Sequence, residues 1–474
     1  MGPAPEDPRK YLRNFLLHFR PTEVPERALR FSLAWGLGVA STTLLMLLMV
    51  SGLLLKFVYE PTPASAYDSI VYLGREVPLG QLLRNLHRWS GYALLTTTLL
   101  HLLRVFYTGA FHTPRQLNWI VGLLLFALVV MSNFTGYLLP WDQISYWAVT
   151  ISTSILDYLP VVGTPLKQWI LGGSEPGPST LMNFYAIHTA VLPILFLFLL
   201  PFHFWRIRKA NGTVVPRAPG EELPVPLPTV RTVPHLVTRE AAVALTVVAV
   251  VLALALLFDA PLAEQANPGL SPNPTKAPWY FMGVQEILLH LHPVFAVLIA
   301  PLLVLAGLVA IPFLKYDTNA AGIWFVSHRG RRLALASAIA GLALTATAVW
   351  VDDRLLRTSG AAPADLVRNG ALPFTVAVLL CGSWYFALRR VFRAAPPPMP
   401  PAKMNELPAR MMPGEIRDGL RLVGVSEDWG SMSPEEAELW RGRIEAKQVV
   451  GSRTGAAARR AVLVFYPGFP PSGP

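Results

Sequence analysis

Cysteine is nearly absent from this sequence of 474 residues, which contains only Cys381. A single thiol excludes a disulfide, a thiolate zinc site and a cysteine-ligated iron–sulfur cluster within the chain. It also excludes the Cys-x-x-Cys-His attachment of a c-type haem. An iron–sulfur cluster, where one is needed, must therefore be held by another chain.

Charged residues are also scarce, at 15% of the sequence, whereas 53% of the residues are hydrophobic. Eight apolar runs are long enough to cross about 30 Å of hydrocarbon. They predict an all-α, polytopic membrane protein with eight transmembrane helices. The runs cover residues 31–58, 88–108, 117–138, 182–205, 240–258, 293–314, 332–351 and 372–388. Some thirty mostly polar residues precede the first run, so no cleavable signal peptide is expected.

Acidic residues are outnumbered, with 29 acidic against 40 basic side chains and a formal net charge of +11. The basic residues gather before the first run and after the fourth, sixth and eighth, which all fall on one side of the membrane. The positive-inside rule assigns this side to the cytoplasm. We therefore expect a bacterial inner membrane, both termini in the cytoplasm and no nucleic-acid partner. The N-terminal segment 1–30 is expected to carry an amphipathic surface helix at Tyr11–Phe19.

Two apolar segments carry paired histidines: His87 with His101, and His188 with His203, which are 14 and 15 residues apart. At about 1.5 Å per residue, either spacing places two imidazoles on one helix face about 21 to 23 Å apart. One such histidine could be a hydrogen-bonding group or a proton relay, but two matched pairs at membrane depth favour ligation. Two bis-imidazole sites suit two non-covalent b-type haems. Both segments start outside, so His87 should pair with His188 near the outer face and His101 with His203 near the inner face.

Glycines repeat at the same spacing in the neighbouring runs, as Gly38 with Gly52 and Gly122 with Gly136. Glycine is common in membrane helices, but a missing side chain also lets a bulky group approach the backbone. Both pairs occur at the ligand spacing. The pattern therefore predicts room for two macrocycles in a four-helix di-haem bundle over residues 31–212.

Arg84 and Arg88 flank His87 near the outer interface. They could pair with haem propionates, or they could be ordinary interfacial arginines whose charged ends reach water. We favour the propionates.

Two outer loops are long enough to form a functional site, from Tyr137 to about Leu181 and from Asp259 to His292. Their prolines and aromatic residues predict short rigid helices that roof a pocket near the outer haem. Residues 356–393 are expected to hold the eighth transmembrane helix. Residues 394–474 form a proline-rich linker and a polar cytoplasmic tail, which we interpret as a docking or assembly segment.

Four motifs together resemble cytochrome b of the quinol-oxidising cytochrome bc complexes. They are Arg84-Asn85-Leu86-His87-Arg88-Trp89-Ser90, Gly136-Tyr137-Leu138-Leu139-Pro140-Trp141-Asp142-Gln143, Phe184-Tyr185-Ala186-Ile187-His188-Thr189 and Arg206-Ile207-Arg208-Lys209. The resemblance covers roughly residues 25–355. It is strongest to the chloroplast and cyanobacterial type, which has the 15-residue second spacing, whereas the mitochondrial branch has 14. In that type two polypeptides make up the region that is fused here, so residues 213–355 would be the quinol-pocket half with three transmembrane helices.

The resemblance implies a proton-translocating quinol:cytochrome c oxidoreductase, with this chain as its catalytic core subunit. Quinol oxidation at an outer site would be bifurcated. One electron would pass to a Rieske-type iron–sulfur subunit and then to a c-type cytochrome or equivalent acceptor. The other would cross through the His87/His188 and His101/His203 haems to a quinone near the cytoplasmic face. The complex would be dimeric and would use the membrane quinone pool. Arg208, with Glu240 behind it, is the candidate for the inner quinone site, although both could be plain loop residues.

Two positions depart from the family pattern. Gly36 stands where the chloroplast type attaches an extra haem through cysteine, so no covalent haem is expected. The family's Pro-Glu-Trp-Tyr at the quinol pocket corresponds to Ala277-Pro278-Trp279-Tyr280, which lacks the carboxylate. A helix starting near Pro278 would put Glu286 on the same face as Trp279. Glu286 could then replace the proton acceptor, or it could pair with Lys276. We predict that Glu286, Tyr280, Trp279 and Asp142 form the catalytic set.

Two other classes of protein remain open on the sequence alone. A di-haem membrane anchor of a dehydrogenase or hydrogenase would move electrons without a bifurcating pocket. A transporter that uses membrane histidines as proton relays would bind no chromophore.

Overall fold

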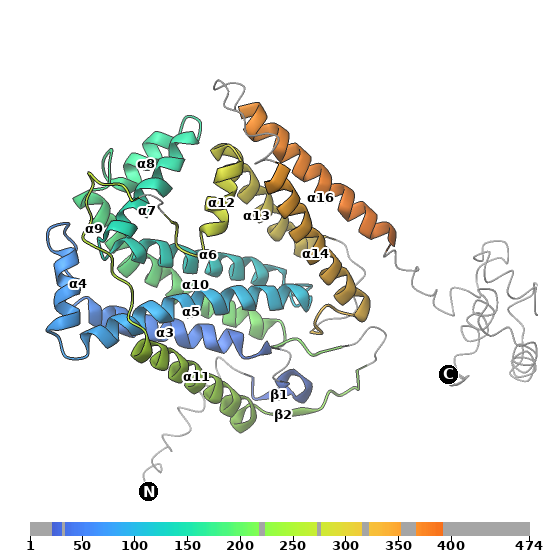
Figure 1. Cartoon of the computed structure of the whole chain (residues 1–474). Coiled ribbons are helices and arrows are strands. Elements are labelled where there is room, and N and C mark those ends of the chain that lie inside the picture. Colours follow the sequence, from blue (N-terminus) through green and yellow to red (C-terminus); the bar gives the residue numbers. More distant parts are fainter. Residues whose placement is uncertain are drawn as a thin grey trace, which may run out of the picture. The chain divides into compact units, whose positions relative to one another are not determined.

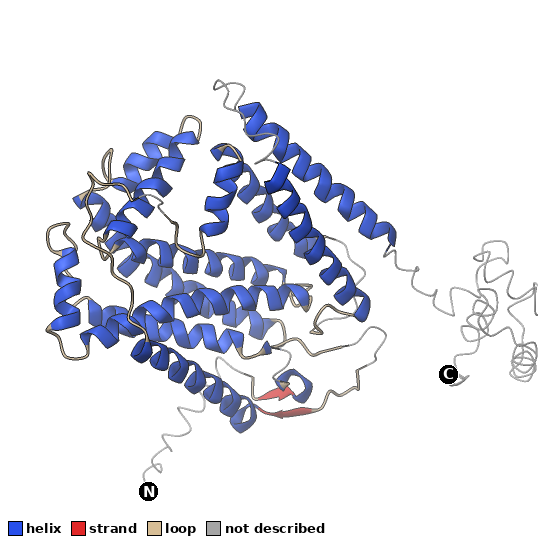
Figure 2. Ribbon diagram, viewed as in Figure 1, coloured by secondary structure: helices blue, strands red, loops and turns tan. Residues whose placement is uncertain are grey.

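The computed structural model describes residues 21–30, 34–217, 223–272, 276–314, 322–351 and 366–391. The predicted helix at Tyr11–Phe19 and the tail over 394–474 lie outside these ranges. Within them almost every element is a helix, and the fold class is all-α (Figure 2). The chain divides after Leu388, and Met1–Leu388 forms one compact unit. The finer domain limits stay predictions.

Long helices account for most of the described chain. They are α3 (Leu37–Leu55), α5 (Gly80–Tyr107), α6 (Gln116–Leu138), the continuous α9 (Pro178–Ala186), η3 (Ile187–Val191) and α10 (Leu192–Lys209), then α11 (Thr232–Leu257), α14 (His328–Val351) and α16 (Leu372–Val391). The shorter elements are η1 (Glu26–Leu29), α4 (Ala66–Arg75), α7 (Gln143–Ser154), η2 (Ile155–Tyr158), α8 (Gly163–Leu171), α12 (Met282–His290), η4 (Val294–Ile299), α13 (Ala300–Ala310), η5 (Ile311–Phe313) and η7 (Leu366–Ala371).

The described residues contain six helices that are long and apolar enough to cross a membrane, which fits a polytopic membrane protein. They are Leu37–Leu55, Gln116–Leu138, Pro178–Lys209, Thr232–Leu257, Val294–Phe313 and Arg329–Trp350. The other two predicted spans differ from these six. Helix α5 is 28 residues long but carries charged and polar side chains, and Leu372–Ala387 is apolar but shorter. The count of eight spans therefore stays a prediction.

Four helices pack in the order α3, α5, α6 and α10, and α11 lies against α3 and α5 (Figure 1). Each of the five supplies a buried apolar side chain to one cluster. These side chains include Leu44, Leu94, Val129, Phe196 and Val251. Close packing of this kind holds helices together in a membrane, where neighbouring lipid is equally apolar. The predicted four-helix bundle is present.

The described helices contain three π-helical turns, η3, η4 and η7, and a proline follows each after one intervening residue. These are Pro193, Pro301 and Pro373. Proline lacks an N–H group and its ring crowds the carbonyl four residues earlier. The backbone responds with bonds that reach back five residues, as from Leu192 N to the Ile187 carbonyl. Such turns often occur at functional sites, and η3 contains His188.

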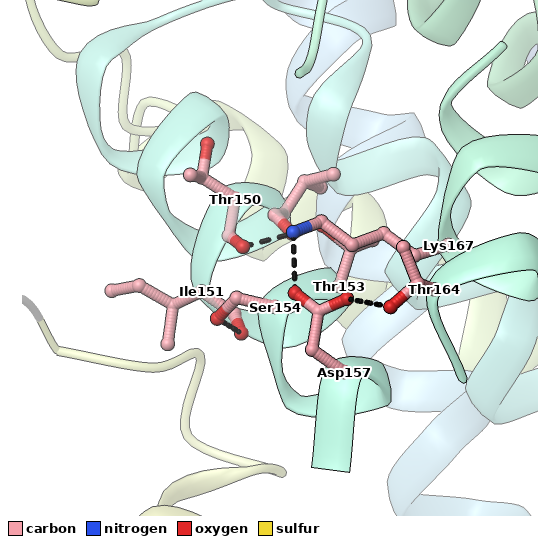
Figure 3. A network of polar contacts seen from close by, with 8 residues as sticks. Thr150, Ile151, Thr153, Ser154, Asp157, Thr164 and Lys167 are labelled. Carbon is pink, nitrogen blue, oxygen red and sulfur yellow. Dashed lines mark hydrogen bonds and ion pairs between the residues drawn. The ribbon is translucent and has the colours of Figure 1, made fainter. Parts of the chain in front are cut away.

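Short helices fill the first of the two long loops, as the sequence predicts, and the names outer and inner follow the orientation predicted from the sequence. Elements α7, η2 and α8 connect α6 to α9. Asp157 of η2 accepts hydrogen bonds from Lys167 at 2.6 Å and from Thr164 at 3.2 Å, which ties η2 to α8 (Figure 3). Phe184 and Val149 are buried in the cluster beneath. The loop therefore has a fixed shape.

An extended segment, residues 258–270, crosses the outer ends of α5 and α7, and we call it the strap. Trp89 Nε1 donates to the Phe258 carbonyl at 2.8 Å, and Tyr67 OH donates to the Ala263 carbonyl at 3.0 Å. Gln143 N donates to the Glu264 carbonyl at 2.7 Å. These hydrogen bonds attach the strap to the bundle.

A two-stranded sheet lies near the other end of α11, and it is absent from the predictions. Strand β1 (Glu23–Pro25) pairs antiparallel with β2 (Thr229–Arg231), with Val24 opposite Val230 (Figure 2). Thr232 N donates to the Thr22 carbonyl at 2.9 Å. This clasp joins the N-terminal segment to the connection between α10 and α11. Pairing across two hundred residues leaves no local signal in the sequence.

Candidate functional site

The outer histidines face each other across the bundle, His87 on α5 and His188 on η3. Their ring centroids are 6.3 Å apart and their planes differ by 77°. Two metal–nitrogen bonds of about 2 Å each, plus the distance from each nitrogen to its ring centre, account for this separation. The pair therefore has the spacing of a bis-imidazole metal site. His101 and His203 are near enough to interact electrostatically, so the histidines are brought together in the predicted pairs.

Hydroxyl groups fix the orientation of the outer imidazoles. Ser51 Oγ lies 2.9 Å from His87 Nδ1, and Thr135 Oγ1 lies 3.2 Å from His188 Nδ1. Each hydroxyl donates its own proton to a carbonyl one turn back, those of Leu47 and Met131, both at 2.8 Å. The hydroxyl oxygens therefore accept from Nδ1–H, which leaves the lone pair on Nε2 for a metal.

The sequence analysis missed these two hydroxyls, although a signal is present. Ser51 directly precedes Gly52 and Thr135 directly precedes Gly136. A hydroxyl residue followed by glycine thus occurs twice at the outer level. At the inner level the corresponding residues are Leu37 and Val121.

Each predicted glycine faces one of the four imidazoles. A Cβ atom added at Gly52 or Gly136 would lie 3.1 or 2.6 Å from Cε1 of His87 or His188. At Gly38 and Gly122 the distances to Cε1 of His101 and of His203 would be 3.5 and 3.7 Å. The sequence analysis assigned these glycines to the macrocycle edge. In the structure they admit the imidazoles themselves.

Close approach to α6 also gives the two imidazoles of the continuous helix a backbone partner. His188 faces the carbonyl of Ser132, four residues before Gly136. His203 faces the carbonyl of Asn118, four residues before Gly122, although its Nδ1 does not reach ordinary hydrogen-bond geometry. Glycine exposes the backbone at both levels, and the fit is tighter at the outer one.

The π turn at His188 explains the unequal spacing of the paired histidines. Helix α5 is regular between His87 and His101. The continuous helix carries η3 between its regular parts, and a π turn holds one residue more than an α turn. Spacings of 14 and 15 residues can therefore reach the same two levels.

Aromatic side chains surround Arg88 beside the outer pair. Arg88 Nη2 donates to Tyr92 OH at 2.5 Å, and the guanidinium lies over the rings of Tyr92 and Tyr137 at 4.7 and 5.1 Å. The Tyr92 ring contacts Trp279 and Tyr280, with centroids 6.0 and 6.5 Å apart. Arg88 Nε and Tyr280 OH are buried without a hydrogen-bond partner. This aromatic cluster is the candidate ligand site, called the aromatic pocket below, because it has two buried polar groups without a partner.

These observations match a known protein family. Residues 25–211 match the family described as Cytochrome b/b6/petB. Over this stretch the chain is similar to the cytochrome b family, and that similarity points to an integral membrane protein that binds b-type haem. The paired histidines, the glycines facing them and the unpartnered Nε of Arg88 fit such a group. Among the described residues there is no cluster of three or more His, Cys, Asp or Glu side chains that could hold a metal ion.

Similarity to a known fold extends beyond residues 25–211. This chain is similar to a protein chain of the solved structure titled "Hyperthermophilic respiratory Complex III". The TM-score is 0.63 and the sequence identity is 23%. The match covers 80% of this chain and 96% of that chain. The likeness is one of fold.

Two residues predicted to act at the site bind the strap. The carboxylate of Asp142 caps α7 by accepting from Ser145 N at 2.9 Å and also accepts from Ala263 N at 3.0 Å. Arg84 donates to the carbonyls of Ala260 and Pro261, both at 2.7 Å. Both polar ends are engaged by backbone groups. A catalytic role for Asp142 and a propionate role for Arg84 remain predictions.

Asn85 was overlooked in the sequence. It is buried, its Nδ2 donates to the Ala255 carbonyl and to Asp259 Oδ1, both at 2.9 Å, and its Oδ1 accepts from Ala260 N at 2.8 Å. A buried amide with partners on a distant segment fixes the strap. The available signal in the sequence was a polar amide only two residues before His87, at the start of a membrane-length helix.

Glu286 lies on α12, which begins at Met282 and not near Pro278 as predicted. The start is later because Pro278 and the next residues form a turn, in which Phe281 N donates to the Pro278 carbonyl. The Glu286 side chain is 62% exposed, and its Oε1 lies 3.5 Å from Nε2 of His290. Its role as proton acceptor remains a prediction.

At the inner end, Arg208 is an exposed residue in the last turn of α10. A stacked pair of indoles, Trp35 and Trp324, lies at the same end, with centroids 4.9 Å apart. The segment after Trp324 is joined to α5, because Phe325 N donates to the Tyr107 carbonyl at 2.8 Å. The role of Arg208 at an inner quinone site is also a prediction.

Proposed function

We propose that this chain is the cytochrome b subunit of a bc-type quinol oxidoreductase and holds two non-covalent b haems. His87 and His188 would hold the outer haem, and His101 and His203 the inner one. The 6.3 Å separation of the outer ring centroids is the observation that carries the proposal. When bound, the haems supply one-electron carriers at two depths of the membrane.

The residues of the chain prepare these sites in three ways. Ser51 and Thr135 hold Nδ1–H of the outer imidazoles, which keeps Nε2 directed at the iron position. The four facing glycines leave the imidazoles room to enter. Arg88 has a buried Nε–H available for a propionate.

Quinol oxidation would take place in the aromatic pocket near Arg88. Trp279 and Tyr280 would contact the quinol ring, and burial raises the pKa of Tyr280, so its hydroxyl stays protonated as a donor. Glu286 would take up a proton from quinol and release it outside. Asp142 would act by holding the strap behind the pocket. Quinone reduction would occur near Arg208 at the inner face, so that turnover translocates protons.

The partners follow from this reaction. One electron from each quinol must leave for a Rieske-type iron–sulfur subunit and a c-type cytochrome or equivalent acceptor. The membrane quinone pool supplies the substrate, and the complex is dimeric. Both termini lie in the cytoplasm of a bacterium whose inner membrane holds the complex.

A covalent third haem is not part of the proposal. Gly36 has φ +61°, which disfavours other residues, and a Cβ atom there would lie 2.7 Å from Cγ2 of Val243. Helix α11 therefore covers the position at which a cysteine would stand.

Haem content of the purified complex tests the ligands. A pyridine haemochrome assay should find two b haems per chain in the natural protein and one in His87→Leu or in His101→Leu. His235→Leu changes a histidine outside both pairs and should retain two. One haem or none in the natural protein would refute the proposal, and a transporter predicts none.

Quinol oxidation separates the proposal from a di-haem anchor. Duroquinol should reduce the haems of the purified complex, and inhibitors of the outer quinol pocket should block this reduction. A di-haem anchor would bind the haems without showing that inhibition.

A further inference from the structure

Tyr92 stands at the centre of the aromatic pocket, although no motif in the sequence marks it. It lies on α5, five residues after His87. Its ring contacts those of Trp279 and Tyr280, at centroid distances of 6.0 and 6.5 Å. It is the residue through which the helix carrying the outer ligand touches the second half of the chain at this pocket.

Arg88 fixes the hydroxyl of Tyr92. The guanidinium donates from Nη2 to Tyr92 OH at 2.5 Å and covers the same ring at 4.7 Å. A hydrogen bond from a charged donor is stronger than a neutral one. The phenol oxygen is therefore held in one place and keeps a second lone pair as an acceptor.

The family's carboxylate position cannot supply this acceptor. Pro278 stands there and is buried, so no polar side chain enters from that position. Glu286, the sequence-based substitute, has a mostly exposed side chain beside His290. Tyr280 OH is buried without a partner and serves as a donor. A quinol hydroxyl in this pocket needs an acceptor as well as a donor.

We propose that Tyr92 recognises the quinol headgroup by accepting a hydrogen bond from one of its hydroxyls, with Arg88 holding Tyr92 in place. Tyr280 donates to the same end of the headgroup, and the rings of Trp279 and Tyr280 contact the quinol ring. This inference rests on the proposed quinol-oxidising function and names a residue for it. Tyr92 acts in binding, and it transfers neither electron nor proton.

Steady-state kinetics of the purified complex with duroquinol test the role. Tyr92→Phe removes the hydroxyl and keeps the ring, so KM should rise about fivefold to tenfold, the effect of losing one hydrogen bond. The maximal rate, the haem content and the reduced-minus-oxidised spectrum should stay at their natural values. Tyr72→Phe removes the hydroxyl of an exposed tyrosine on α4 and should leave KM unchanged.

An unchanged KM in Tyr92→Phe would overturn the inference. If that variant does not assemble, Tyr92→Met provides a second side chain without a hydroxyl and should show the same rise. Loss of haem from both variants would show that the hydroxyl serves assembly, which also overturns it. Failure of the natural complex to oxidise duroquinol would instead refute the proposed function.

Discussion

The outer and inner histidine pairs lie on the same helices, but their surroundings differ. A Cβ atom on the facing glycines would lie 3.1 and 2.6 Å from the outer imidazoles, against 3.5 and 3.7 Å from the inner ones. Only the outer glycines follow hydroxyl residues, Ser51 and Thr135, which reach Nδ1. One helical repeat therefore carries a tight polar site and a looser apolar one.

The hydroxyls at the outer pair should make the reduction potentials of the two haems unequal, and this inequality sets the direction of electron transfer. An acceptor at Nδ1 makes the imidazole a stronger donor to the metal, and a stronger donor stabilises the oxidised iron. We therefore expect the hydroxyls to lower the reduction potential of the outer haem relative to the inner one. Electrons would then move inward spontaneously.

The largest expected effect comes from adding one methyl group at each level. Gly136→Ala would place Cβ 2.6 Å from His188 Cε1, which forces the imidazole to move, whereas Gly122→Ala makes an ordinary contact at 3.7 Å. Overpacking costs about 1–3 kcal/mol. Gly136→Ala should lose about half of the haem per chain in a haemochrome assay, and Gly122→Ala should retain it. Equal retention in the two variants would remove the difference in tightness.

The next effect concerns the strap that crosses the outer end. Asn85→Leu leaves the Ala255 carbonyl and Ala260 N without their partners. A buried unpaired group costs about 1–3 kcal/mol, so the thermal midpoint of the purified complex should fall by several degrees. Gln81→Leu removes a more exposed amide that binds the same Asp259 and should change the midpoint less. A larger loss in Gln81→Leu would contradict the anchoring role of Asn85.

The hydroxyls themselves should have a smaller effect, visible in redox titration. Ser51→Ala and Thr135→Val each remove an acceptor from an outer imidazole, so the outer midpoint potential should rise by some tens of millivolts, about 1 kcal/mol for one electron. The inner potential should not change. Ser41→Ala is the control, because its hydroxyl bonds Leu37 and Thr97 and no histidine. A fall in the outer potential would reverse the proposed order.

The smallest effect is a dependence of stability on pH at the outer end. Hydrogen bonds from Asn85 and then Gln81 lower the pKa of Asp259 below its ordinary 3.8. A lowered pKa contributes stability that is fully present above pH 3.8 and is lost as the pH falls through the lower value. Asp259→Asn should therefore flatten the decline of the thermal midpoint as the pH falls below about 3.8. The same slope in both proteins would exclude this contribution.

Periodicity made the bundle and the pairing of its four histidines predictable. The spacing of His87 and His101 and the matching glycines place the ligands in helical registers, which are local properties of the sequence. Length and hydropathy likewise predicted long apolar helices. The family's motifs, not the spacing, directed attention to Trp279 and Tyr280.

Contacts between distant segments were not predictable. Asn85 donates a hydrogen bond to Asp259, which lies more than 170 residues further along the chain. No local sequence pattern near either residue indicates this contact. Arg84 was assigned to a propionate because its charge suggested an anion, but backbone carbonyls engage it. Asp142 carried a better signal, since an aspartate just before a helix is a typical N-terminal cap.

The proline after the π turn has a consequence for how such a chain can change over time. Helix α5 and the continuous helix need matching heights for their ligands, not matching residue counts. A π turn already holds one residue more than an α turn, so it can lose that residue and become a regular α turn. An insertion or deletion of a single codon near Pro193 could therefore be absorbed locally, while the same event between His87 and His101 would rotate one ligand away from its partner.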